Sequence, residues 1–159
     1  MTTSETREQR NARVQRYLEE MVAAEGIPRA PMTKALANCR LGFVSTAGVY
    51  RLDQTPFDTD SPHGDWSYRE IPKETPVAEL GIAHTHYDHA HAERDINVVF
   101  PLERLREMEA EAVFAELASP LYSFMGYIPD PKPLVETTAT EVAAKVRATR
   151  LDAVLLSPA

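Results

Sequence analysis

Residues 40–46 read RLGFVST, a short apolar run that ends in Val, Ser and Thr. The pair Ala47-Gly48 follows it directly. A short apolar run that opens into a glycine turn is typical of a strand buried in a parallel sheet. The sequence therefore predicts a buried strand over residues 40–46.

Strands and helices are predicted to alternate on both sides of this run. Other apolar runs predict strands over residues 77–83, 121–125 and 152–156. Helical spacing of apolar residues and high helix propensity predict helices over residues 5–24 and 102–117. The sequence TATE at 138–141 matches a capping box and predicts the start of a further helix.

This alternation favours an α/β fold with a mostly parallel sheet. The 159 residues suit a single domain. We expect three layers, in a Rossmann-like or flavodoxin-like arrangement, with an N-terminal helix in residues 1–26 and the α/β domain in residues 27–159. Ligands of such sheets bind at the carboxyl ends of the strands. Those ends are predicted at residues 45–48, 84–91, 125–129 and 157–159.

Composition excludes several classes of function. The net charge of -7 disfavours a nucleic-acid partner. The chain has no long apolar run for a membrane span, no apolar segment of a secretory signal near its start, and no glycine-rich phosphate loop. The single cysteine, Cys39, suits a reducing compartment. We therefore expect a cytoplasmic protein without a nucleotide cofactor.

Four of the five histidines lie in one segment, HTHYDHAH, at residues 84–91. Imidazole is a common ligand of zinc or iron and also the general acid or base best suited to neutral pH. On an extended segment His84 and His86 project to one side, and a turn after them would bring His89 back. We predict one transition metal, zinc or iron, on these three side chains. The alternative is that some of them are solvated loop histidines.

Further candidates surround the cluster. His84, His86, Asp88 and Asp95 are predicted to be catalytic. Asp95 either orients an imidazole or caps a loop. The residues predicted to bind substrate are Thr46, Gly48, Arg69 and Tyr127.

Arg69 lies in a proline-rich stretch, residues 52–78, that predicts a long loop. It either binds a substrate carboxylate or pins this loop by a salt bridge. Thr46 and Gly48 follow the first strand, and Gly48 either allows close approach of a ligand or simply forms a turn. Met125-Gly126-Tyr127 has the same two interpretations.

The segment HTHYDHAHAERDINVVFPLERLREM (84–108) resembles the glycine/sarcosine/betaine reductase component B and D-proline reductase family. Four other segments agree in the same order along the chain: LGFVSTAGVY (41–50), GDWSYREIP (64–72), YSFMGYIPDP (122–131) and LDAVLLSP (151–158). The resemblance covers residues 25–158.

This resemblance implies reductive cleavage of a carbon–nitrogen bond. In the family a selenocysteine or cysteine attacks the carbon, and a dithiol protein supplies electrons. The reactive residue follows the segment matched here by residues 155–158, so we expect a protein partner to supply it. Cys39 precedes the first strand, about 20 Å from the carboxyl ends at 3.3 Å per residue, and is expected to be structural.

The sequence thus predicts a reductase subunit for a small amino-acid-like or amine substrate, with a protein partner. Such a subunit should expose an apolar patch where the partner docks. One alternative is a self-contained metal-dependent hydrolase or lyase that uses the histidine cluster and binds the metal by itself. Another is a non-catalytic partner subunit.

Overall fold

The computed structural model describes residues 12, 15, 16, 19, 20, 23 and 30–159. The described positions before residue 30 are helical, and the rest of the predicted helix over residues 5–24 lies outside the described residues. The chain divides into two compact units, Met1–Pro31 and Met32–Ala159. The sheet and the candidate site belong to the second unit.

Strand β1 (Arg40–Ser45) lies at the centre of the main sheet. Along one side it pairs in parallel with β7 (Ala153–Ser157). Along its other side it pairs in parallel first with β5 (Glu116–Leu117) and then with β6 (Leu121–Phe124). Strand β3 (Tyr68–Ile71) adds antiparallel to β6. The sheet is therefore mostly parallel, and this prediction is confirmed.

One face of the sheet packs against helix α2 (Leu102–Ala110). Leu41 and Phe43 of β1 share a buried core with Leu102 and Leu105 of the helix. Burying each side chain of this size stabilises the fold by about 1.5–3 kcal/mol. Alternate residues of β1 thus face α2, as expected for the period of two in a strand.

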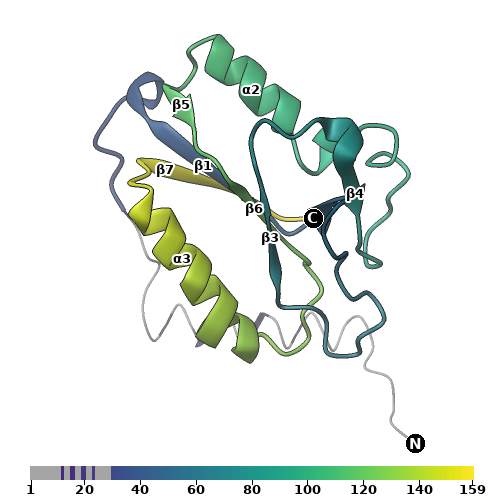
Figure 1. Cartoon of the computed structure of the whole chain (residues 1–159). Coiled ribbons are helices and arrows are strands. Elements are labelled where there is room, and N and C mark those ends of the chain that lie inside the picture. Colours follow the sequence, from purple (N-terminus) through teal and green to yellow (C-terminus); the bar gives the residue numbers. More distant parts are fainter. Residues whose placement is uncertain (1–11, 13–14, 17–18, 21–22, 24–29) are drawn as a thin grey trace, which may run out of the picture. The chain divides into compact units, whose positions relative to one another are not determined.

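The opposite face packs against helix α3 (Ala139–Ala148). Val142 of the helix lies in a smaller apolar cluster with Tyr122 and Phe124 of β6, and Val44 of β1 packs against this cluster. Figure 1 shows α2 and α3 on opposite sides of the strands. The molecule has the three layers that the sequence predicts, whereas the Rossmann-like or flavodoxin-like subtype stays a prediction.

The predicted strand over residues 77–83 is wrong in both length and position. Residues Val77–Glu79 form the 3-10 turn η2, and only β4 (Leu80–Ile82) is extended. β4 pairs antiparallel with β2 (Val49–Arg51) in a separate two-stranded sheet. The chain turns at Gly48, where φ is +70°, directly before β2, and this small sheet gives β4 its pairing partner.

Two other predicted boundaries are corrected. The helix predicted over residues 102–117 ends at Ala110 because Ala112 adopts a φ of +58°, after which Phe114 is fully buried. The loop predicted over residues 52–78 contains β3 and the first two residues of η2. A search for apolar runs misses β3 because two of its four residues, Arg69 and Glu70, are charged.

The predicted capping box at Thr138 is also wrong. Thr138 has helical dihedral angles, and its hydroxyl donates to the Trp66 carbonyl instead of capping α3. Instead of a capped start, a π-helical turn, η4 (Leu134–Thr138), leads directly into α3. The remaining short turns are η1 (Leu36–Asn38) and η3 (Ile96–Val98).

Among the described residues, no helix has the length and apolar character needed to cross a membrane.

Candidate functional site

The carboxyl ends of β1, β6 and β7 meet at one edge of the main sheet. Ala47, just beyond β1, forms an isolated bridge with Met125, just beyond β6. The Thr46 N–H donates to the Ser157 carbonyl of β7 at 3.1 Å. The structure therefore brings together the strand ends at which the sequence predicts a ligand.

Strand β4 delivers the histidine segment to this same edge. The Ala83 N–H donates to the Gly48 carbonyl at 2.9 Å. A Cβ atom at Gly48 would lie 2.4 Å from the Ala83 carbonyl oxygen and 3.0 Å from the Cβ of His84. With its positive φ, this position accepts only glycine. Gly48 therefore lets His84 approach the end of β1.

His84 is the most buried histidine of the segment, with 4% of its surface exposed. Its Nδ1 accepts a hydrogen bond from the His86 N–H at 3.0 Å. A ring nitrogen that accepts carries no proton, so the neutral ring holds its proton on Nε2. Nε2 is buried and has no hydrogen-bond partner among the described residues. A buried donor without a partner costs about 1–3 kcal/mol, and a ligand oxygen would remove that cost.

Gly126 leaves a small space beside this nitrogen. A Cβ atom at Gly126 would lie 3.1 Å from Nε2 of His84, 3.0 Å from the Thr46 carbonyl oxygen and 3.3 Å from Oγ1 of Thr46. That hydroxyl oxygen accepts from the Ala159 N–H at 3.1 Å, so its own O–H can donate elsewhere. An imidazole N–H and a hydroxyl therefore border the space over Gly126.

The buried groups of the site are neutral at physiological pH. Burial, followed by the nearby His86 and His89, lowers the pKa of His84 to about 4. Burial raises the pKa of Tyr87 to about 12, and its hydroxyl donates to the Ala47 carbonyl at 3.0 Å. Near neutral pH His84 is therefore neutral and can donate a hydrogen bond through Nε2.

His86 lies on the exposed side of His84 and stacks on Tyr127. The ring centroids are 3.5 Å apart and the planes differ by 8°. The Nδ1 atom of His86 is 3.1 Å from the Thr85 hydroxyl. The structure thus brings a predicted catalytic residue and a predicted substrate-binding residue into direct contact.

A cleft of about 510 Å³ opens beside His84. Residues of the histidine segment other than His86 line it, together with Glu93: His84, Thr85, Tyr87, Asp88, His89 and Ala90. This volume lies within the range of about 300–1,000 Å³ that is usual for ligand sites. Asp88 borders the cleft with an exposed carboxylate, which accepts from the Ala90 N–H at 2.9 Å.

Comparison with known proteins decides the family. The family model for glycine/sarcosine/betaine reductase selenoprotein B matches residues 15–159. This chain belongs to that family.

Two curated relatives of this reductase family are subunits of larger enzymes. D-proline reductase subunit gamma of Acetoanaerobium sticklandii is 33% identical over 127 residues, which cover 80% of this chain and 51% of the relative. Glycine reductase complex component B subunit gamma of Carboxydothermus hydrogenoformans is 27% identical over 140 residues, which cover 86% of this chain and 32% of the relative. The chain thus spans about half or less of these relatives. No solved structure matches the chain significantly.

The structure of this reductase-family chain does not assemble the predicted metal ligands. The ring centroids of His86 and His89 lie 6.0 and 6.5 Å from that of His84. In the described part of the chain, no group of three or more His, Cys, Asp or Glu side chains is placed to hold a metal ion. Zinc or iron binding at this segment stays a prediction.

Arg69 and Asp95 make contacts that fit the structural alternatives. The Arg69 guanidinium donates to the carbonyls of Thr55 and Pro56 and lies 4.2 Å from the Phe57 ring centroid, so it holds the preceding loop. Asp95 accepts from the Asn97 N–H at 3.0 Å and caps η3. The substrate-binding role of Arg69 and the catalytic role of Asp95 stay predictions.

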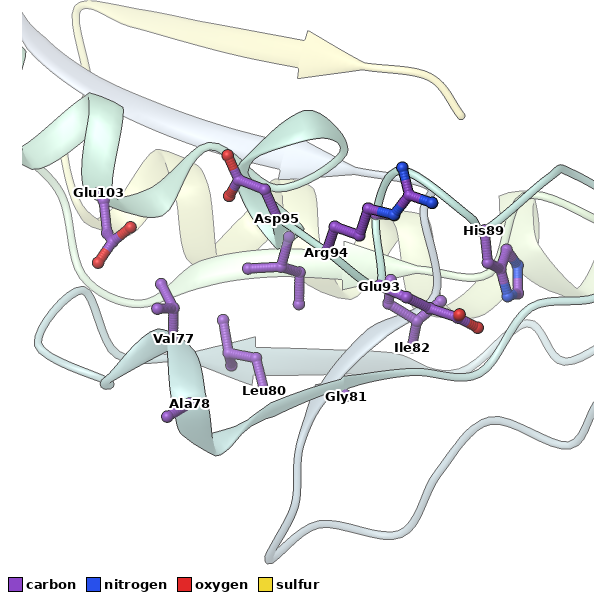
Figure 2. Close-up of a pocket in the computed structure, with 12 residues that line it drawn as sticks. Val77, Ala78, Leu80, Gly81, Ile82, His89, Glu93, Arg94, Asp95 and Glu103 are labelled. Atoms are coloured by element: carbon purple, nitrogen blue, oxygen red, sulfur yellow. The ribbon is translucent and has the colours of Figure 1, made fainter.

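A second cleft, of about 530 Å³, lies along β4 (Figure 2). Apolar side chains of β4 and of the preceding turn line it, with Glu103 at one end and His89 and Glu93 at the other. His89 borders both clefts, and its buried Nε2 has no hydrogen-bond partner among the described residues.

Sequence reasoning missed Tyr87, this second cleft and the role of Gly126 beside His84. Tyr87 lies inside the histidine segment, so its place in the sequence could have identified it as a site residue. The contact between His84 and Gly126 joins residues far apart in the sequence and left no local signal.

Proposed function

We propose that this chain is the substrate-holding subunit of a reductase of the glycine/betaine/D-proline reductase type. Its substrate is a small amino-acid-like or amine compound in the cleft beside the histidine segment. The observation that carries this proposal is the buried Nε2–H of His84, without a partner among the described residues, beside the space over Gly126. Membership of the family and the subunit names of the relatives support it.

The groups around Gly126 suit an oxygen of the substrate. The His84 Nε2–H and the Thr46 hydroxyl border the same space and can both donate. A carboxylate oxygen accepts two such hydrogen bonds, and charge-assisted bonds are about twice as strong as neutral ones. We therefore place the carboxylate of an amino-acid-like substrate against these two donors; its oxygen has to stay clear of the Thr46 carbonyl oxygen, an acceptor that borders the same space.

In the reaction that we propose, an unprotonated amine substrate needs a proton for its leaving nitrogen, whereas a quaternary ammonium leaves as a neutral amine without one. A thiolate or selenolate forms a bond to the substrate carbon while the carbon–nitrogen bond breaks and its electron pair leaves with the nitrogen. A dithiol protein then converts the carbon–sulfur or carbon–selenium bond to C–H and S–H or Se–H and becomes a disulfide. We assign the proton to His86, because it is exposed, lies in the chain between the cleft-lining residues Thr85 and Tyr87, and carries an imidazole, which transfers protons well near neutral pH.

We propose that a partner subunit supplies the nucleophile, because the one cysteine of these 159 residues lies far from the site. Cys39 is buried directly before β1, and its Sγ contacts the Ala35 carbonyl at 3.4 Å. The length of β1 separates it from the site by about 20 Å at 3.3 Å per residue. A nucleophile must contact the carbon that it attacks, so Cys39 does not serve.

Ligand binding to the isolated chain tests the site. We expect glycine, betaine or D-proline to shift the NMR signals of His84, and Gly126→Ala to weaken binding by about 10-fold because its methyl group fills the space beside Nε2. Gly81→Ala is the matched control, since the three atoms nearest to its Cβ would belong to the Tyr50 and Leu52 side chains. Equal affinity of the wild-type chain and Gly126→Ala would contradict the proposal.

The predicted transition metal has a separate test. Metal analysis of the purified chain and of His86→Ala compares the bound zinc and iron directly. Metal that is lost on substitution would support the prediction and the metal-dependent alternative. Absence of metal from both samples would contradict them and leave the proposed carboxylate site unaffected.

A further inference from the structure

Strand β7 has the sequence of an interior strand but lies at an edge of the sheet. Residues Ala153–Ser157 read AVLLS, and continuous apolar runs are typical of parallel strands that are covered on both faces. Within the described residues, β1 is the one strand that pairs with β7. Val154, Leu155 and Leu156 are 37%, 45% and 69% exposed. The patch formed by these three residues is the β7 patch.

The β7 patch extends over both faces of the sheet. Leu155 pairs in register with Phe43, whose side chain faces α2. Leu156 pairs in register with Val44, whose side chain faces α3. A helix that packs on one face would leave the other apolar side chains in water. An added strand would cover both faces, because its own side chains alternate between them.

Residues Ala153–Ser157 of β7 also lack two of the devices that block strand addition, charged side chains and proline. Natural edges are usually protected by lysine, proline, bulges or a covering loop. Every second residue of an edge strand directs its peptide N–H and C=O away from the sheet, and these groups can pair with an incoming strand.

We propose that β7 accepts a parallel β-strand from the partner polypeptide that supplies the cysteine or selenocysteine. This inference rests on the proposed function. The carboxyl end of β7 lies at the site, where Ser157 and Ala159 bond to Thr46. A strand that runs parallel to β7 therefore delivers the residue after its own carboxyl end to the same edge, as in other parallel α/β sheets.

A second copy of this chain fits less well. Two copies related by a twofold axis would pair their β7 strands antiparallel and place their two sites at opposite ends. The copy would bring only Cys39, which precedes β1 at the amino end of the strands. The matched region covers 51% and 32% of the two relatives, so about half or more of each relative lies outside it, which is room for a further strand.

Site-specific photocrosslinking tests the partner. A benzoylphenylalanine replaces Leu156 in the tagged full chain, the chain is expressed in its native host, and the crosslinked peptide is sequenced. We expect a short apolar segment that is followed directly by cysteine or selenocysteine. The matched control places the crosslinker at Val135, which is 54% exposed near the start of α3. A peptide without either residue, a second copy of β7, or residues 5–24 of this chain would each overturn the proposal.

Association strength separates this inference from the proposed function. We expect Leu156→Lys to weaken binding of the sequenced partner by at least about 10-fold, because a lysine is desolvated in the new interface. The same variant should bind the small ligand as the wild-type chain does, whereas Gly126→Ala should lose the ligand and keep the partner. Hydrogen exchange should show protection of residues 153–157 in the complex alone. Unchanged exchange there in the complex would overturn strand addition and leave the ligand site standing.

Discussion

The two edges of the main sheet differ in sequence and in cover. The outer strand β3 reads YREI and carries charged side chains, whereas β7 reads AVLLS. Arg69 of β3 bonds to the loop before it, and Glu70 pairs with Lys145 of α3. No comparable contact covers the β7 patch within the described part of the chain.

The two edges therefore differ in how readily they pair with another chain: the β3 edge hinders such pairing, and the β7 edge favours it. The β3 edge is covered by this chain: the Arg69 and Glu70 side chains have partners, and the Tyr68 and Glu70 carbonyls accept from the Arg69 guanidinium and the Gln54 amide. The β7 edge offers apolar side chains and peptide groups to a strand from outside. The same sheet therefore has one edge built for stability and another suited to assembly.

The largest effect is expected at the closed edge. Arg69→Ala should lower the free energy of unfolding by about 2–4 kcal/mol, because it removes several hydrogen bonds and the cation above Phe57. Urea unfolding measures this change. The control Arg104→Ala removes an exposed arginine of α2 and should cost under about 0.5 kcal/mol. Equal costs for the two variants would mean that Arg69 does not hold the β3 edge closed.

A smaller and pH-dependent effect is expected at Asp65, which lies in the loop that covers β3. Burial raises its pKa, but hydrogen bonds from Ser67 and Asp58 and the charge of Arg69 outweigh burial, so the pKa falls below the usual 3.8. The unfolded chain therefore binds a proton first as the pH falls. The stabilisation is present above pH 3.8 and is lost as the pH falls through the folded-state pKa.

Fluorescence of Trp66, the neighbouring residue and the single tryptophan, follows this titration. Asp65→Asn should cost about 1 kcal/mol at neutral pH and remove part of the acid sensitivity. A stability profile between pH 3 and 7 that is the same in both proteins would show that the carboxylate does not stabilise this edge.

The smallest effect on folding is expected at the open edge. Leu156→Lys should change the free energy of unfolding by under about 0.5 kcal/mol, since 69% of Leu156 is exposed. It should also reduce aggregation on heating, because an edge lysine hinders pairing between chains. Light scattering during a thermal ramp measures this, with Val135→Lys as the control. Equal suppression of aggregation by both lysines would show that the β7 patch does not drive association between chains.

Apolar runs predicted β1 and β6 because these strands are buried. The apolar run of β7 predicted this strand as well, although Val154, Leu155 and Leu156 are exposed. The same approach missed β3, whose Arg69 and Glu70 are satisfied by tertiary contacts that no local pattern records. Thr138 failed as a predicted cap because the Trp66 carbonyl, 72 residues away, takes its hydroxyl.

At the site, the sequence predicted His84 as a catalytic residue, but it did not predict that the imidazole is neutral. Its tautomer depends on the His86 N–H, and its pKa depends on burial against the ends of β1 and β6. The predicted metal set of His84, His86 and His89 rested on spacing alone. Spacing does not determine how three rings are oriented once the segment has folded.

The pairing of β1 with β7 also determines how long β1 lacks one of its partner strands while the chain is being synthesised. Leu41 and Ala153 are register partners 112 residues apart. At about 5–20 residues per second, a ribosome needs about 6–22 s between them. For that interval the central strand has itself an open, apolar edge, and non-local pairing of this kind is slow to form. The growing chain therefore presents to the cell, for several seconds, the same kind of adhesive strand that the finished sheet keeps only at its outer edge.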